Sequence, residues 1–104
     1  MLEIRPNCEL CDKDLPPTFP DARICTYECT YCVDCVEKTL HNTCPTCGGN
    51  FVPRPIRPKT AFRAELKLGL SHHPASTHRR HSRFLMDDIA AHVARIKDIP
   101  PNRR

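Results

Sequence analysis

The chain lacks tryptophan and has little of what usually fills a hydrophobic core. Its 104 residues include 3 glycines, 4 phenylalanines and 2 tyrosines, whereas 11 are prolines and 8 are cysteines. A chain of this length and composition forms one small domain, and burial of its few large apolar side chains does not stabilise that domain unaided. The sequence therefore predicts a fold held by additional cross-links.

Long apolar runs are absent as well. No stretch approaches the roughly 18 apolar residues of a membrane span. Residues 1–7 break at Pro6, before they form the apolar run of about 7–15 residues that a signal peptide needs. We therefore predict a cytoplasmic protein. Structural disulfides are rare in the reducing cytosol, so clustered cysteines there indicate metal or redox chemistry.

Charge is distributed unevenly between two segments. Residues 1–52 have a formal charge of −4, from 4 Lys and Arg against 8 Asp and Glu, and they contain every cysteine. Residues 53–104 have a formal charge of +8, from 12 against 4, and contain five of the six histidines. We predict a cysteine-rich metal-binding domain over 1–52 and a basic linker and tail over 53–104.

The eight cysteines form a ladder of closely spaced pairs. They stand at Cys8, Cys11, Cys25, Cys29, Cys32, Cys35, Cys44 and Cys47. Two thiolates separated by two residues can reach one ion, while the intervening backbone N–H groups donate to sulfur. Eight thiolates complete two four-cysteine sites with no open coordination position, which is typical of structural zinc. The ladder therefore predicts two structural Zn²⁺ ions.

Other cysteine chemistry fits this spacing less well. Cys29, Cys32 and Cys35 begin like a ferredoxin run, whose next cysteine follows after about three residues. Here eight residues separate Cys35 from Cys44. Four disulfides would require an oxidising compartment, and no thioredoxin-like pattern surrounds any pair. An iron–sulfur cluster stays open as the alternative to zinc.

Spacing alone leaves the pairing of the cysteines open. A sequential pairing would give the first four cysteines to one ion and the last four to the other. An interleaved pairing would form two different groups: Cys8, Cys11, Cys32 and Cys35 as site 1, and Cys25, Cys29, Cys44 and Cys47 as site 2.

The order of the pairs, ending in Cys44-Pro45-Thr46-Cys47, resembles a RING-type zinc finger over residues 8–47. Cys29 stands where such fingers usually place histidine. The resemblance implies the interleaved, cross-braced arrangement. The segments 2–8, 11–17 and 44–49 also resemble a family of small bacterial cysteine-rich proteins classed as a domain of unknown function. This second resemblance implies a bacterial cytosolic zinc protein and assigns no activity.

The predicted fold is a small zinc-stabilised α+β domain with a short hairpin and one short helix, followed by a tail with one helix. Residues 22–27 read as a strand and 34–41 as a two-turn helix. In the tail we expect a stiff linker over 53–59, a weak helix over 61–68 and an amphipathic helix over about 82–99, N-capped by Ser82. The apolar stripe of this last helix is Leu85, Ile89, Val93 and Ile96. We expect the stripe to cover the small core or, alternatively, to meet a partner or a second copy of the chain.

The sequence contains no legible pairing of a nucleophile with a base, so we predict no enzymatic activity. We predict a protein-interaction module that presents the loops around Leu10 and 44–48. A RING-type ubiquitin-ligase-like adaptor is the alternative. Val36–Thr43 lacks the tryptophan usual in such ligases, and Gly48 stands where they commonly carry a basic residue.

The basic tail raises a second alternative, which is nucleic-acid binding, although no aromatic residues interleave its cations to stack bases. The histidines at 72, 73, 78 and 81 have no regular ligand spacing, and we expect a solvated loop there. The cations that could follow a phosphate backbone are Arg54, Arg57, Lys59, Arg63, Arg79, Arg80, Arg83, Arg103 and Arg104.

Overall fold

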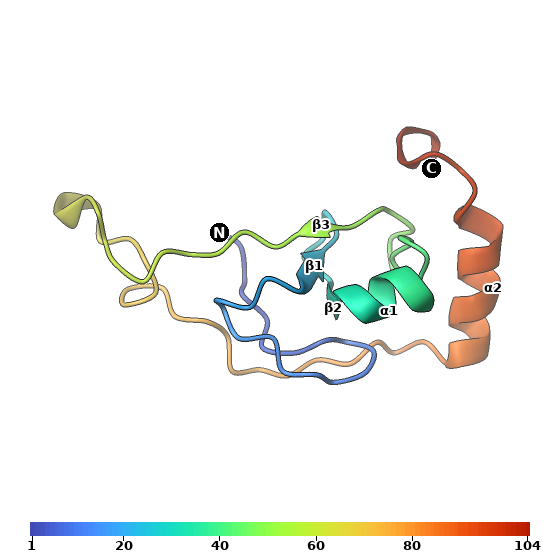
Figure 1. Ribbon diagram of the computed structural model, residues 1–104, viewed down its shortest axis with the longest axis horizontal. Helices are drawn as coiled ribbons and strands as arrows, with labels where there is room; N and C mark the ends of the chain where they lie inside the picture. The colour runs from blue at the N-terminus through green and yellow to red at the C-terminus, as the bar shows by residue number, and fades with distance from the viewer.

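Short strands, two α-helices and long irregular segments make up the computed structural model, which describes residues 1–104 (Figure 1). The molecule is elongated, with extents of 48 × 27 × 19 Å. The combination of a small sheet with α-helices confirms the predicted α+β class. The elements in chain order are β1 (Ala22–Ile24), β2 (Thr30–Cys32), α1 (Val33–Lys38), β3 (Val52–Pro53), η1 (Ala64–Leu66), α2 (Met86–Ile96) and η2 (Pro101–Arg103).

The sheet is antiparallel with the strand order β2-β1-β3. Ile24 lies opposite Thr30 in β2 and opposite Val52 in β3. The predicted strand over 22–27 is shorter than expected because the chain turns after Ile24, and the N–H of Cys25 donates to the carbonyl of Cys29 at 3.2 Å. The two-residue β3 is too short to show a periodicity in the sequence. It extends the sheet across the predicted boundary between residues 52 and 53.

Helix α1 begins one residue before the predicted segment and ends three residues earlier than expected. The helix ends because the backbone leaves the helical conformation. The N–H of Leu40 donates to the carbonyl of Cys35, five residues earlier, and His41 and Asn42 have positive φ values of 46° and 58°. Val36 and Leu40 are buried on one face, as the predicted pattern requires.

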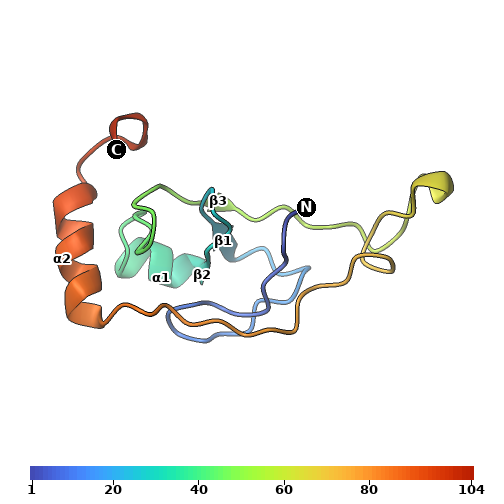
Figure 2. The same cartoon turned by 180° about the vertical axis from the view of Figure 1, so that it is seen from behind.

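Helix α2 is shorter than the predicted 82–99. Leu85, not Ser82, is its N-cap: the hydroxyl oxygen of Ser82 accepts from the N–H of Phe84 at 3.4 Å, ahead of the helix, and the N–H of Ser82 donates to the carbonyl of Glu9 at 2.7 Å. Ile89 and Val93 are 1% and 4% exposed and belong to the core cluster, so α2 covers the cysteine-rich segment. In Figures 1 and 2 the helix stands at one end of the molecule beside α1. Neither α-helix is long and apolar enough to cross a bilayer.

The core joins a few hydrophobic side chains to buried cysteines. Tyr31 and Phe51 meet edge to face, with ring centroids 5.4 Å apart. Leu15 and Leu40 are fully buried beside them. The cysteines that belong to the same 13-residue cluster are Cys8, Cys25, Cys29, Cys32 and Cys44. Apolar burial and the cysteine groups are therefore one structural unit.

Residues 76–82 of the tail run along the cysteine-rich segment and hydrogen-bond to it. The N–H of Ser76 donates to the carbonyl of Ile4 at 2.9 Å. The side-chain amide of Asn7 donates to the carbonyl of Arg80 at 2.8 Å and accepts from its N–H at 3.2 Å. Hydrogen bonds to main-chain groups of the tail thus hold the segment before α2 in place, and the amino-acid composition of the tail does not predict them.

Residues 54–76 form a projecting arm, which lies at the opposite end of the molecule from α2 (Figures 1 and 2). The predicted helix over 61–68 is wrong, since only the single 3₁₀ turn η1 forms there. The N–H of Leu70 donates to the carbonyl of Pro58 at 2.8 Å and closes the arm across its neck. Gly69 has φ +93°, and a Cβ there would lie 3.0 Å from the same carbonyl oxygen. Only glycine suits this close approach.

Candidate metal centre

The first cysteine group combines the first Cys-x-x-Cys turn with the junction of β2 and α1. The sulfurs of Cys8, Cys11, Cys32 and Cys35 all lie within 4.8 Å of one another. Cys11 Sγ and Cys32 Sγ are 3.7 Å apart. Four thiolates around one zinc at about 2.3 Å have sulfurs about 3.8 Å apart, so this group has the size of a tetrahedral metal site.

Local structure places these four sulfurs. The carbonyl of Cys8 accepts from the N–H of Asp12, whose φ of 66° closes the first turn. Cys32 ends β2 and is the N-cap of α1, and Cys35 follows in the first helical turn. Burial and the neighbouring side chain of Cys32 raise the pKa of Cys35 in the metal-free protein. Two unrelated local motifs therefore meet at one point.

The second group joins the turn after β1 to the last Cys-x-x-Cys turn. Cys25, Cys44 and Cys47 have sulfurs within 4.8 Å of one another. Backbone donors support them: the N–H of Tyr27 donates to Cys25 Sγ, and that of Gly49 donates to Cys47 Sγ, both at 3.3 Å. The N–H of Tyr27 lies between Cys25 and Cys29, whereas that of Gly49 follows its pair, so only the first is an intervening donor of the predicted kind.

Cys29 lies beside this second group but outside its mutual 4.8 Å limit. Hydrogen bonding to the side chains of Cys25 and then Cys44 lowers the pKa of Cys29 to about 3. Hydrogen bonding to the side chains of Cys25 and Cys29 raises the pKa of Cys44. These contacts with Cys25 and Cys44 make Cys29 the residue placed to complete a fourth coordination position.

The grouping is interleaved along the chain, as the RING resemblance implies, and not sequential. The sequential pairing would require Cys8 and Cys25 to share an ion, whereas the structure places them in different groups. Each donor set is composed of sulfur, which suits zinc and iron–sulfur chemistry and excludes hard ions such as Mg²⁺. Each cysteine group can hold one metal ion.

The tail closes over the second group. His92 on α2 lies with Nε2 2.9 Å from the carbonyl oxygen of Cys44. Arg104 Nη1 donates to the carbonyls of Asn42 and Gly48 at 3.0 and 3.1 Å. Gly48 is buried, with φ +77°, and a Cβ there would lie 3.3 Å from Ile96. The loop over 44–48, predicted as an interaction surface, is thus packed largely beneath the chain's own tail.

Two residues of this region escape sequence reasoning. His92 stands on the helical stripe between apolar residues, with no spacing that relates it to the cysteines. Arg54 is one of the cations that the sequence offers to a phosphate backbone, but it is 5% exposed and donates to three backbone carbonyls. That correction removes Arg54 from the set of cations available to a nucleic acid. Neither residue has a local sequence signal, because each acts on a distant turn.

A small α+β protein with two interleaved cysteine groups is the class that the fold and the site define. The family model described as "Protein of unknown function (DUF1272)" matches residues 1–57, so the chain belongs to this family. The resemblance to a bacterial family of unknown function is thereby confirmed. An uncharacterized protein of Rhizobium meliloti (strain 1021) is 53% identical over 79 residues, which cover 76% of this chain and 84% of that protein. No solved structure matches the chain.

Proposed function

We propose that the chain is a protein-interaction module whose metal groups hold structural zinc and which performs no catalysis of its own. Four thiolates per ion leave no position for a substrate or an attacking water. The observation that carries the interaction role is the arm, whose tip exposes apolar side chains in a protein that buries few of them.

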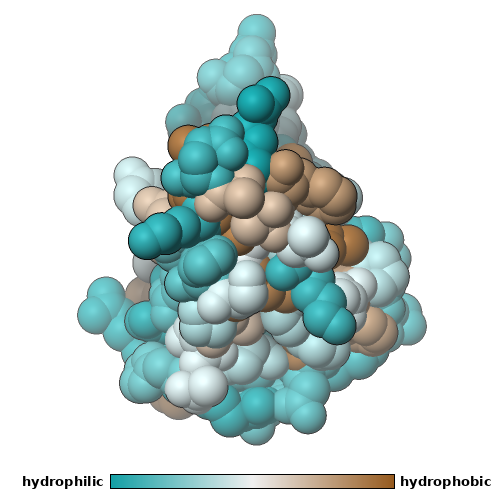
Figure 3. Space-filling model, turned by 90° about the vertical axis from the view of Figure 1, so that its left-hand side faces the viewer, coloured by the Kyte–Doolittle hydropathy of each residue, from teal (hydrophilic) through white to brown (hydrophobic).

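The arm tip combines apolar and cationic side chains. Phe62 is 85% exposed, Leu66 54% and Leu68 49%. Phe62 and Leu68 line a cavity of about 500 Å³ together with Met1, Arg57 and Arg63. Figure 3 faces this end of the molecule, where brown apolar atoms adjoin teal hydrophilic ones. Contiguous exposed apolar surface marks interaction sites, and flanking cations select acidic partners. The expected partner is a protein segment in which a large apolar side chain lies beside Asp or Glu.

This assignment moves the interaction surface away from the one that the sequence predicts. Pro45 is buried, and the carbonyl of Leu10 lies 3.2 Å from Nε2 of His81 in the tail. A RING-type ligase-like adaptor would need that surface to meet its conjugating enzyme. We therefore favour the arm over the adaptor alternative.

Zinc occupancy is the first testable consequence. Native mass spectrometry of protein purified under reducing conditions is expected to show two zinc ions per chain. Cys44→Ser, which removes a buried sulfur of the second group, is expected to retain one. Cys35→Ser is the matched variant for the first group and is likewise expected to retain one. A mass that corresponds to an iron–sulfur cluster would contradict the proposal. So would two zinc ions in both variants, because the substituted cysteines would then not be ligands.

The interaction role predicts a specific loss on Phe62→Ser. Metal-loaded protein immobilised on a support is expected to capture a partner from an extract of its source cells. Phe62→Ser is expected to reduce the affinity of capture about tenfold or more, because burial of a Phe contributes about 1.5–3 kcal/mol. Leu85→Ser is the control, since Leu85 is 75% exposed but lies outside the arm. Equal capture by both variants would exclude the arm tip as the docking surface.

A further inference from the structure

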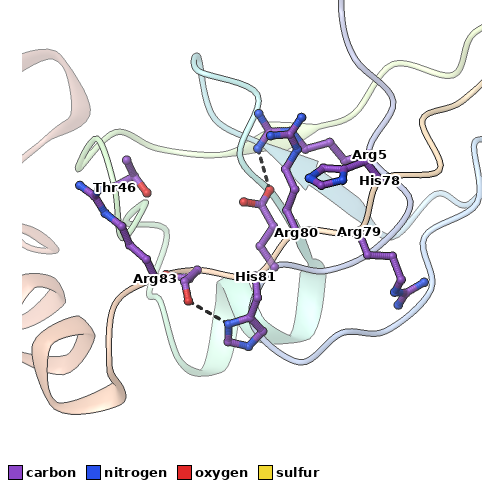
Figure 4. A pocket seen from close by; sticks show the side chains of 9 residues that line it. Arg5, Thr46, His78, Arg79, Arg80, His81 and Arg83 are labelled. Atoms are coloured by element: carbon purple, nitrogen blue, oxygen red, sulfur yellow. Dashed lines mark hydrogen bonds and ion pairs between the residues drawn. The ribbon is translucent and has the colours of Figure 1, made fainter.

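A cavity of about 480 Å³ with no hydrophobic residue in its lining lies between the N-terminal segment, the 44–47 turn and the tail before α2 (Figure 4). It is distinct from both cysteine groups and from the arm tip. Its wall needs both halves of the chain, and it therefore exists only while the tail is docked. The lining residues are Arg5, Glu9, Thr46, His78, Arg79, Arg80, His81, Ser82 and Arg83.

Cationic groups dominate this lining. The lining contains four arginines and one carboxylate, that of Glu9. Glu9 is 6% exposed, and its Oε2 already accepts from Arg5 Nη1 at 2.9 Å and from the N–H of Thr30 at 2.5 Å. The single acidic group of the lining therefore already accepts hydrogen bonds from Arg5 and Thr30, and its charge is largely compensated before an anion enters the cavity.

The arginines retain donors for a ligand. A guanidinium carries five N–H donors. Arg5 uses Nε on Glu3 and Nη1 on Glu9, and Arg80 uses Nη2 on both carboxylate oxygens of Glu3 at 3.0 Å. Arg80 Nε is buried without a hydrogen-bond partner, so the Glu3 pair leaves this side chain incompletely satisfied. The carboxylates hold the two guanidiniums in position and leave the rest of each fork unbonded.

Arg83 adds a cation on the opposite wall. It has no ion pair, its guanidinium lies 5.1 Å from the ring centroid of Phe84, and it stands beside Thr46 in Figure 4. Arg79 instead points away from the centre and pairs with Asp12 and Asp14. Donors therefore converge on the cavity from two sides, with hydroxyl groups of Thr46 and Ser82 in its lining.

We propose that this cavity binds a phosphorylated small anion that carries more than one phosphate group. Guanidinium forks match phosphate oxygens, and donors on opposite walls suit a tetrahedral or extended oxyanion better than a single planar carboxylate. The volume exceeds what one phosphate fills and lies within the usual range of small-ligand sites. The lining offers no aromatic face on which a base could stack, so a nucleic acid is the less suitable ligand.

Inorganic pyrophosphate is the probe. Isothermal titration of the zinc-loaded full chain is expected to show one saturable site per chain. Arg83→Ala is expected to weaken binding about tenfold or more, because it removes charge-assisted hydrogen bonds. Arg103→Ala is the matched control, since Arg103 is an exposed cation outside the cavity. Native mass spectrometry before and after titration checks that pyrophosphate has not extracted zinc.

His78→Ala provides a second variant at an exposed position of the lining. It is expected to weaken pyrophosphate binding less than Arg83→Ala does. Absence of saturable binding, or equal weakening by Arg83→Ala and Arg103→Ala, would overturn the site. Tighter binding of a single-stranded oligonucleotide, with a steep salt dependence, would assign the surface to nucleic acid and overturn the small-anion proposal.

Discussion

Removal of the metal from the purified protein by a strong chelator is expected to unfold residues 1–52. The strands are two or three residues long and α1 has six residues, so neither is stable in isolation. Structural zinc contributes about 10–16 kcal/mol of apparent free energy per site, which is as large as the total stability of an ordinary domain. Far-UV circular dichroism in a reducing buffer measures the loss.

The tail is expected to detach in the same transition. Ile89 and Val93 are buried against the cysteine-containing core, and His92 and Arg104 bond to the turn that carries Cys44. The control is the same chelator saturated with zinc, and addition of zinc to the stripped protein should restore the spectrum. A folded spectrum that persists after complete metal removal, verified by mass, would show that apolar packing alone holds the fold.

The sequence predicts the cysteine-rich segment well because its constraints are local. Pair spacing fixes which turns present two sulfurs, and the apolar spacing of Val36 and Leu40 fixes the buried face of α1. The choice between interleaved and sequential grouping depends on how separate turns meet. That information came from the RING resemblance, because no spacing rule contains it.

The tail is predicted poorly because its structure depends on contacts with distant residues. Ser82, expected at a helix N-cap, instead joins the tail to the carbonyl of Glu9 through its N–H, and α2 begins only at Met86. The arm has the composition of a linker, but Arg57 donates to the carbonyls of Leu2 and His73 and pins its base. Hydrogen bonds to backbone carbonyls leave no pattern in the sequence of the acceptor segment.

Arg54 is the clearest such case, and Arg54→Leu is expected to lower the free energy of unfolding of the zinc-loaded protein by about 3 kcal/mol. Its Nη1 donates to the carbonyl of Arg5 at 2.8 Å, and its Nη2 donates to those of Leu15 and Pro16 at 2.9 and 3.2 Å. Burial lowers the pKa of Arg54, and no carboxylate pairs with it. Its three hydrogen bonds offset the cost of burying the charge, and leucine would leave the three carbonyls without this donor.

Urea titration of the zinc-loaded variants measures the effect. Arg63→Leu, at an exposed position on the arm, is the control and is expected to change the free energy of unfolding by less than about 0.5 kcal/mol. Arg54→Lys is expected to recover only part of the loss, because an ammonium lacks the fork that reaches carbonyls in two directions. If Arg54→Leu unfolds at the same urea concentration as Arg63→Leu, the guanidinium does not join the N-terminal segment to the end of β3. The tail would then be held by its other contacts, among them those of Arg57, α2 and residues 76–82.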